Sequence, residues 1–428
     1  MYDTLIVGAG LAGLACARQL QQAGRSPLIL EQSDDVGGRI RTDRVEGFQL
    51  DRGFQVLLDS YPEAQRVLDF AALKLQPFQA GALVRQAGKF VRVADPRRHP
   101  TAALSTLFSP VGNAADKLRL ARLVWNVNRG PLAACFDGPE QTTLDALRQA
   151  GLSPEIVEKF LRPFLSGVFL DPKLRTSSKM FQFVFRMFSR GAACLPSAGM
   201  RAIPRQLAAS LAADAIRLNT TVTAVRPRSV TLASGEQLSA PAVILAVEGP
   251  AAAKLAGGSL NSQGVGVTCL YYAAPRPPVD EPLLVLNGEG RGPINNLCVP
   301  TNVAATYGPP GEHLVSVSVL SAPAERKALE PAVRDQLIDW FGAGARDWRL
   351  LRTYRIPYAL PDQSPPALAR PERPVRHRGL YVCGDHLDNA SIQGALVSGR
   401  RAAEAVLQDL WGVATDGVPS RAARQTSA

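Results

Sequence analysis

Residues 4–13 read Thr-Leu-Ile-Val-Gly-Ala-Gly-Leu-Ala-Gly and lead into a helix-like run at 14–21. This order predicts a buried strand, a glycine turn and a helix. Gly8 permits the tight turn, Gly10 lets backbone amides approach a pyrophosphate, and Gly13 lets the helix pack closely on the strand. The amino end of the helix would face the phosphates. The stretch therefore predicts a dinucleotide-binding βαβ unit.

A carboxylate and a second glycine turn support this interpretation. Glu31 follows the strand-like run 27–30, about twenty residues after the glycines. A carboxylate at that point accepts hydrogen bonds from a ribose 2′-hydroxyl, which argues against a 2′-phosphate and hence against NADP. Gly37, Gly38 and Arg39 come next. Bare backbone beside a forked cation suits a diphosphate.

Composition limits the other function classes. A chain of 428 residues with 46% hydrophobic and 20% charged residues is expected to form two domains. No run reaches the eighteen or so apolar residues of a spanning helix, and Asp3 stands where a leader would be basic, so a cytoplasmic protein is expected. The six cysteines include no CxxC pair, so neither a metal site nor a disulfide framework is predicted.

The net charge of +11 is the remaining compositional feature. Nucleic-acid binding would need a basic stripe with interleaved aromatics, which the sequence lacks, so no nucleic-acid partner is expected. Two interpretations stay open. The arginines form a solvated surface, or they attract the protein to an anionic membrane surface as a peripheral contact.

Three separated segments are predicted to build one α/β, Rossmann-like nucleotide-binding domain: residues 1–75, 195–248 and 365–412. Within the second segment, strands are expected at 216–225, 229–232 and 242–247, after a helix at 204–213. The intervening segments 76–194 and 249–364 would form an α+β substrate-binding domain, the first mostly helical and the second with strands at 267–273 and 313–320. Residues 413–428 are expected to be a disordered tail.

The third segment contains a strand that ends in Gly384-Asp385, followed by Ala390-Ser391-Ile392-Gln393-Gly394-Ala395. Ser391 is a suitable cap for a helix beginning there, and the first amides of that helix would point at whatever lies in front of it.

In combination these motifs resemble the superfamily of flavin-dependent amine oxidases, phytoene desaturases and protoporphyrinogen oxidases. The resemblance implies noncovalently bound FAD, with Glu31 on the ribose, the turn and Arg39 around the diphosphate, and Val222 beside the adenine. Asp385 would lie near the ribityl phosphate, and Ile392 and Gln393 would offer amides to the flavin. The implied cofactor-binding residues are Gly8, Gly10, Leu11, Ala12, Gly13, Glu31, Gly37, Gly38, Arg39, Gly53, Phe54, Gln55, Val222, Gly384, Asp385, Ser391, Ile392 and Gln393.

Within the superfamily, residues 47–62 are similar to plant-type phytoene desaturases and hydroxysqualene dehydroxylases. In that stretch a glycine and a polar residue, here Gly53 and Gln55, would pass the flavin. Amine oxidases usually carry an aromatic residue near the last helix as one wall of a cage for the amine, whereas this chain has Ile392 and Gln393. The spacing from Asp385 to Ala390 is shorter than in plant desaturases, which leaves the substrate open.

Aromatic residues gather in one short region, and they permit two interpretations: a lipid tunnel whose mouth rests on a membrane, or ordinary core packing. They are Phe160, Phe164, Phe169, Phe181, Phe183, Phe185 and Phe188.

The catalytic side chains are not identified by any triad, carboxylate pair or metal cluster, so catalysis is assigned mainly to FAD. Gln55, Tyr358 and His386 are the candidates. Tyr354 and Tyr358 match a segment that passes the flavin in this superfamily, and Tyr358 would either line the cavity or be a structural tyrosine. His386 would relay a proton or, as the default, lie in a surface loop.

The resulting hypothesis is an FAD-dependent oxidoreductase that desaturates or isomerises an isoprenoid or carotenoid-like lipid by hydride transfer to flavin. A second dinucleotide fingerprint is missing, so oxygen or a quinone would accept the electrons. Two alternatives remain: an oxidase of amines or of a porphyrinogen, and a non-catalytic, membrane-associated binding protein that contains FAD.

Overall fold

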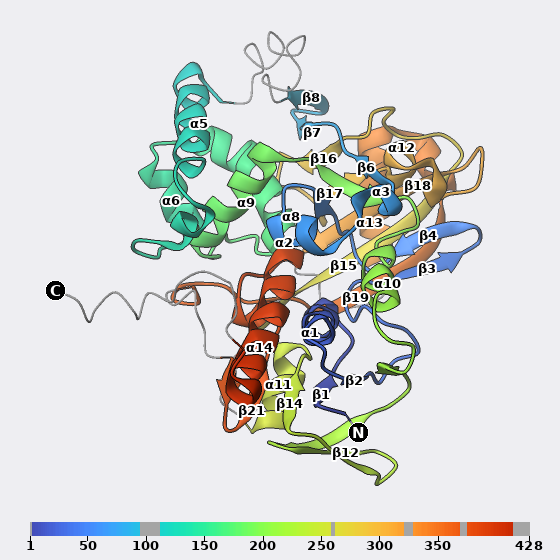
Figure 1. Ribbon diagram of the computed structural model, residues 1–428. Coiled ribbons are helices and arrows are strands. Elements are labelled where there is room, and N and C mark those ends of the chain that lie inside the picture. The colour runs from blue at the N-terminus through green and yellow to red at the C-terminus, as the bar shows by residue number, and fades with distance from the viewer. Residues whose placement is uncertain (1, 95–111, 258–261, 321–327, 369–374, 414–428) are drawn as a thin grey trace, which may run out of the picture.

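A six-stranded sheet carries the first glycine turn (Figure 1). The computed structural model describes residues 2–94, 112–257, 262–320, 328–368 and 375–413. Strand β1 is buried along its whole length between β2 and β14, and all three run parallel. A strand buried on both faces needs a continuous apolar run, as the sequence indicated. The order is β10 (Ile216–Arg217), β2 (Pro27–Leu30), β1 (Thr4–Val7), β14 (Ala242–Leu245), β21 (Leu380–Val382) and β20 (Arg376–His377).

Two layers cover this sheet. Helices α1 (Leu11–Gln22) and α14 (Ile392–Trp411) pack on one face, and a three-stranded sheet packs on the other. Two glycines make this helix packing possible. A Cβ on Gly13 would lie 2.1 Å from the carbonyl oxygen of Gly8, and a Cβ on Gly399 would lie 2.1 Å from the carbonyl oxygen of Ala12. The three-stranded sheet consists of β11 (Val222–Arg226), β12 (Ser229–Leu232) and β13 (Gln237–Ser239).

A seven-stranded sheet forms the other half of the molecule. One face packs on α13 (Leu329–Phe341) through Val315, Val317 and Trp340, and the other faces α8 (Arg162–Phe169). Its strands come from the segments predicted for substrate binding, although the domain boundaries themselves stay a prediction. The order is β19 (Arg349–Pro361), β15 (Gly264–Ala274), β18 (His313–Leu320), β17 (Ile294–Cys298), β16 (Leu284–Asn287), β7 (Gly81–Gln86) and β8 (Lys89–Ala94).

The remaining helices lie around these sheets, and α5, α6 and α9 form a group at the upper left of Figure 1. Their bounds are α2 (Pro62–Val67), α3 (Phe70–Leu73), α5 (Ala114–Val127), α6 (Thr143–Gln149), α7 (Pro154–Ile156), α9 (Ser178–Arg190), α10 (Ala202–Ala209), α11 (Gly249–Ala256) and α12 (Pro300–Val303). Two small sheets complete the structure, one of β3 (Thr42–Val45) and β4 (Phe48–Asp51), the other of β5 (Leu57–Leu58), β9 (Ala193–Pro196) and β6 (Leu75–Pro77).

Two predictions about elements were wrong in extent. The strand expected at 216–225 is two strands in different sheets, because the chain turns at Asn219, which has a left-handed φ of 51°. Segment 76–194 is not mostly helical from its start, because β7 and β8 form a hairpin there. The turn of this hairpin is Ala87-Gly88, both with positive φ. A disordered tail was predicted at residues 413–428. Residues 414–428 lie outside the part of the chain that the structure describes.

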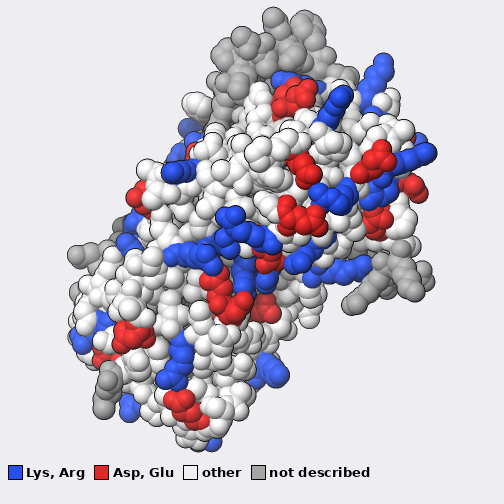
Figure 2. Space-filling view, turned by 90° about the vertical axis from the view of Figure 1, so that its right-hand side faces the viewer, with Lys and Arg blue, Asp and Glu red and all other residues white. Residues whose placement is uncertain are grey.

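Charged side chains of both signs share one face of the molecule. Figure 2, which views the right-hand side of Figure 1, shows lysine and arginine gathered across the middle with aspartate and glutamate beside them. Ion pairs of this kind join β3 to its neighbours: Arg52 and Arg352 approach Asp43 to 2.9 and 3.7 Å. Paired arginines contribute less to the long-range field than the net charge alone suggests.

Candidate active site

A cavity of about 1930 Å³ lies between the two large sheets. Its lining includes the Gly8 turn, β11 and the start of α14 on one side, and α5, α8 and α9 on the other. Pockets for single small ligands are usually roughly 300–1,000 Å³. The cavity therefore has room for a dinucleotide and a second, large molecule.

The turn before α1 presents bare backbone to this cavity. Gly10 caps the helix with no side-chain hydrogen bond, and a Cβ added to Gly10 would meet no protein atom within 4 Å. Leu11 and Ala12, whose amides begin the helix, also line the cavity. Open space in front of uncapped helix amides suits a diphosphate.

Glu31 lies beside that turn at the end of β2. Its Oε2 accepts a hydrogen bond from the Ala9 amide at 2.7 Å, and its Oε1 accepts one from the Ser33 amide at 2.9 Å. The carboxylate is thus fixed in the cavity wall. Val222, at the start of β11, lines the same region.

Arg39 joins the second glycine turn to the C-terminal block. Its Nη2 donates to Asp385 Oδ1 at 2.6 Å and its Nη1 donates to the Ala359 carbonyl at 2.8 Å. Burial opposes the charge of this guanidinium, but Asp385 raises its pKa, so it stays a cation. Gly37 and Gly38 have positive φ, at 116° and 58°, and leave the backbone bare next to it.

The start of α14 completes this end of the cavity. Ser391 Oγ accepts the Gly394 amide at 3.0 Å, which confirms the predicted cap. Ile392 lines the cavity, whereas the Gln393 side chain turns away and accepts the Glu63 amide at 2.8 Å. Of the cofactor-binding residues expected from the sequence, all but Gly13 and Gln393 line this one cavity. Their contacts with a cofactor stay predictions.

The three candidate catalytic residues lie in different settings. Only Gln55 lines the cavity; its Nε2 donates to the Arg39 carbonyl at 2.9 Å, and its buried Oε1 has no partner within the described residues. Tyr358 lies behind Arg39, with the guanidinium 5.5 Å from its ring centroid, and burial raises the pKa of its phenol. His386 is buried, so the surface-loop expectation is wrong, because the chain after Gly384 packs inward. Tyr354 donates to Asp43 at 2.7 Å.

The phenylalanines divide between the two interpretations that the sequence left open. Phe160, Phe164, Phe185 and Phe188 line the cavity, with the rings of Phe164 and Phe188 5.3 Å apart. Phe181 and Phe183 are core residues, so they do not belong to the cavity wall.

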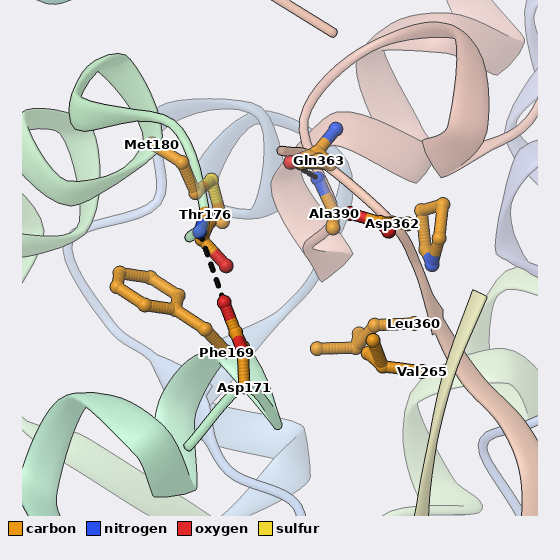
Figure 3. A pocket seen from close by; sticks show the side chains of 10 residues that line it. Phe169, Asp171, Thr176, Met180, Val265, Leu360, Asp362, Gln363 and Ala390 are labelled. Atoms are coloured by element: carbon orange, nitrogen blue, oxygen red, sulfur yellow. Dashed lines mark hydrogen bonds between the residues drawn. The ribbon is translucent and has the colours of Figure 1, made fainter. Parts of the chain in front are cut away.

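Phe169 lines a small side pocket of about 10 Å³ (Figure 3). This space shares Met180, Leu360 and Ala390 with the main cavity and holds no more than about one water. Asp171 and Asp362 are labelled beside this space in Figure 3, and Asp171 accepts the Thr176 amide at 3.1 Å. Because Asp171 also accepts the Lys173 and Arg175 amides, it stabilises its own loop.

Residues 11–407 match the family described as flavin containing amine oxidoreductase. The chain belongs to this family. It is accordingly an FAD-dependent oxidoreductase, as its sequence motifs indicated.

Individual relatives of the flavin oxidoreductase family are similar over shorter stretches. Protoporphyrinogen oxidase 2 of Arabidopsis thaliana is 26% identical over 164 residues, which cover 38% of this chain and 31% of that protein. A lycopene-forming phytoene desaturase of Pantoea ananas is 46% identical over 59 residues, 14% of this chain and 12% of that protein. These matches span less than a third of either relative.

The fold of the family extends over nearly the whole chain. An oxidoreductase of Methanosarcina mazei superposes with a TM-score of 0.73 at 19% identity, covering 94% of this chain and 99% of that one. The α/β fold with an FAD-binding part and a substrate-binding part is thereby confirmed.

The residues at the cavity fit FAD. Bare backbone at Gly10 and the cation Arg39 suit its diphosphate, Glu31 suits a ribose hydroxyl, and the unpartnered Gln55 Oε1 is an acceptor for a polar edge of the flavin. When bound, FAD supplies the electron acceptor for the oxidation.

Several cavity residues were missed by the sequence reasoning. Lys117, Val124 and Trp125 of α5 line the wall, as do Asn296 of β17 and Ser318 of β18. The apolar residues spaced three and four apart in α5 predict an amphipathic helix, but no local pattern connects β17 to a site.

Proposed function

We propose that this enzyme desaturates or isomerises an isoprenoid or carotenoid-like lipid. The cavity wall opposite the glycine turns is built mainly of Phe, Leu, Val and Ala side chains. An apolar chain gains free energy by leaving water for such a wall, at about 25 cal/mol per Å². The similarity to a phytoene desaturase supports the same substrate class.

The observation that carries the proposal is the placement of charge in the cavity. Its acidic lining residues among those described are Glu31, Glu248 and Asp385, all on the glycine-turn side. The described lining residues of segments 76–194 and 249–364 include lysine but no aspartate or glutamate. An ammonium substrate would leave water without a carboxylate to pair with, which is costly. The wall therefore favours a neutral, apolar substrate over an amine.

The chain's own contribution would be binding, orientation and exclusion of water. Phe54 and Phe78 both line the cavity and pack edge to face with ring centroids 6.1 Å apart. Such rigid rings hold a flexible chain in few positions, which lowers the entropic part of the barrier. Gln55 is held by Arg39 and would fix the polar edge of the cofactor next to them.

Anaerobic mixing tests the proposal. The FAD-loaded protein should lose its visible flavin absorbance with a polyene isoprenoid dispersed in detergent, and should keep it with a panel of monoamines and polyamines. Bleaching by amines alone, or by a porphyrinogen alone, would replace the proposal with the corresponding oxidase. An unchanged spectrum with every compound, together with no isomerised polyene on chromatography of the mixture, would favour the binding protein. Reoxidation by oxygen or by a soluble quinone then identifies the acceptor, which we propose to be one of these two.

We further propose that α5 rests on an anionic lipid surface. No helix of the described residues is long and apolar enough to cross a bilayer. Leu118 is 73% exposed on α5, and Trp125, which also borders the cavity, is 66% exposed. Arg119 and Arg122 are exposed between them. Aromatic and aliphatic side chains flanked by arginine suit the boundary between headgroups and acyl chains. Because α5 also lines the cavity, this contact would place its wall next to the source of a lipid substrate.

A further inference from the structure

Two polar side chains face each other across strands in the apolar part of the cavity. Asn296 of β17 lies directly opposite Ser318 of β18, so both project from the same face of the seven-stranded sheet. Both line the cavity, although they are only 3% and 4% exposed. Their neighbours in the lining include Phe164 and Val168 of α8.

The neighbouring hydrogen bonds orient the Asn296 amide. Asn295 Nδ2 donates to Asn296 Oδ1 at 2.9 Å and to the Pro163 carbonyl at 3.0 Å. Helix α8 lies close on the same side, since a Cβ on Gly167 would lie 2.9 Å from that oxygen. Because the Asn296 side-chain oxygen already accepts the hydrogen bond from Asn295, its amino group is the part of the amide that can bind a ligand. That group is a hydrogen-bond donor.

Ser318 is the second polar residue of the pair. It differs from Ser316, two positions earlier on the same strand, in its hydrogen bonding and in its access to the cavity. The Ser316 hydroxyl lies 3.5 Å from the Cys269 thiol, with which it shares a hydrogen bond, and Ser316 does not line the cavity. Within the described part of the chain, neither the Ser318 hydroxyl nor Asn296 Nδ2 makes a hydrogen bond. Two neighbouring polar groups thus remain available in a wall that is otherwise mostly apolar.

We infer that Asn296 and Ser318 recognise a neutral oxygen group, a hydroxyl or carbonyl, on an otherwise apolar substrate. This inference rests on the proposed function and narrows its substrate class from hydrocarbons to oxygenated isoprenoids. A pure hydrocarbon would bury both polar groups without partners, and each such group costs about 1–3 kcal/mol. An oxygen placed between them satisfies both. Among the residues that the structure describes, neither side chain has a charged hydrogen-bond partner, so a neutral oxygen fits better than a carboxylate or phosphate.

The test compares two ligands on the FAD-loaded protein: the isoprenoid alcohol geranylgeraniol and the hydrocarbon of the same skeleton without the hydroxyl. Dissociation constants are measured from changes in the flavin spectrum in one detergent. The unchanged protein should bind the alcohol at least about tenfold more tightly. Asn296→Leu and Ser318→Ala should each reduce that preference several-fold while keeping hydrocarbon affinity. Ser316→Ala is the matched control and should keep the preference.

Equal affinity of the unchanged protein for both ligands would overturn the inference and leave the proposed function intact. Loss of the preference in Ser316→Ala to the same degree would also overturn it, since the effect would then be a general disturbance of β18. Binding of neither ligand would contradict the proposed function itself. Thermal unfolding of each variant shows whether the sheet is retained.

Discussion

Arg39 Nη2 lies 2.6 Å from Asp385 Oδ1, although the two residues are 346 positions apart in the chain. The pair connects the glycine turn after β2 with the block that precedes α14, and both residues line the cavity. One charged hydrogen bond in the cavity wall therefore joins two of the three segments predicted to bind FAD. It adds to the packing of α14 on α1 and to the ion pair of Arg400 with Glu63.

Replacing either partner should weaken FAD binding. Arg39→Gln and Asp385→Asn each remove the ion pair, and the freed partner then reorients in the cavity wall. A charged hydrogen bond is worth about 1.5–3 kcal/mol, and partial exposure of Arg39 reduces this, so we expect roughly a tenfold higher Kd in a fluorescence titration of the apoprotein. Asp409→Asn is the control, because its Arg376 pair lies away from the cavity. Unchanged affinity in both variants would contradict the role of the pair.

The two glycines at the start of α1 should differ sharply on substitution by alanine. Gly10 has a φ of −70° and open space around an added Cβ, so Gly10→Ala should fold normally and lose FAD affinity. Gly13→Ala would force a Cβ to 2.1 Å from the Gly8 oxygen, so its apoprotein should be less stable by several kcal/mol. Thermal unfolding without FAD and FAD titration separate the two effects. A lower Tm in Gly10→Ala would contradict the prediction, because it would show that the open space at Gly10 is needed for stability of the protein and not only for FAD.

Local patterns explain which parts of the site the sequence predicted. The Gly8 turn and the Ser391 cap each depend on residues within a few positions, and the structure has them as expected. Glu31 directly follows β2 and accepts from the Ala9 amide, and its contact with a ribose stays a prediction. The hairpins β3–β4 and β7–β8 were missed even though their turns, Glu46-Gly47 and Ala87-Gly88, are two-residue turns with positive φ. Each turn ends in glycine between strand-forming runs, which is the signal that was available.

Long-range pairing explains what the sequence did not predict. Asn296 and Ser318 come together only because β17 pairs with β18 in one register. Helix α8, which also lines the cavity, packs on the face of the sheet that carries both side chains. His386 was expected in a surface loop because the sequence shows no clear neighbour that would tune its pKa, yet tertiary packing buries it. Such contacts depend on the whole sheet and not on neighbouring residues.

Asp51 should make stability depend on pH. It is buried beside the Gly53 turn, accepts from Tyr307 Oη at 2.8 Å and from the Met200 amide at 3.0 Å, and burial raises its pKa to about 6. In the unfolded chain the pKa is near 3.8. Between these values the folded state binds more protons, so this group lowers the free energy of unfolding as pH rises from about 4 to 6, by about 3 kcal/mol in all.

Asp51→Asn should remove this dependence. In urea unfolding, the stability of the variant relative to the unchanged protein should rise between pH 4 and pH 7. Asp409→Asn should change little between pH 4 and pH 7, because the hydrogen bond from Arg376 lowers the pKa of Asp409 below 3.8 and its effect on stability therefore falls below about pH 4. A difference between Asp51→Asn and the unchanged protein that stays constant with pH would show that Asp51 ionises normally in the folded state.

Vesicle binding should depend on the exposed face of α5. The protein should sediment with phosphatidylglycerol vesicles more than with phosphatidylcholine vesicles, and less as salt screens the attraction. Trp125→Ala and Arg122→Glu should each lower the bound fraction about fivefold, since a basic residue near such a surface contributes about 1 kcal/mol. Trp340 and Trp348 are buried, and Trp411 is half-buried at the end of α14 with the Arg25 guanidinium 4.1 Å from its ring centroid. A blue shift of fluorescence on binding should therefore disappear mainly with Trp125.

Leu350→Ala is the matched control for that face, because Leu350 is an exposed apolar residue on β19 and lies outside the cavity lining. It should bind vesicles like the unchanged protein. Equal binding by Trp125→Ala would place the membrane contact elsewhere. If size-exclusion chromatography shows a dimer that Trp125→Ala dissociates, and vesicles are not bound, then α5 is covered by a second copy of the chain. A lipid substrate would in that case reach the cavity by another route.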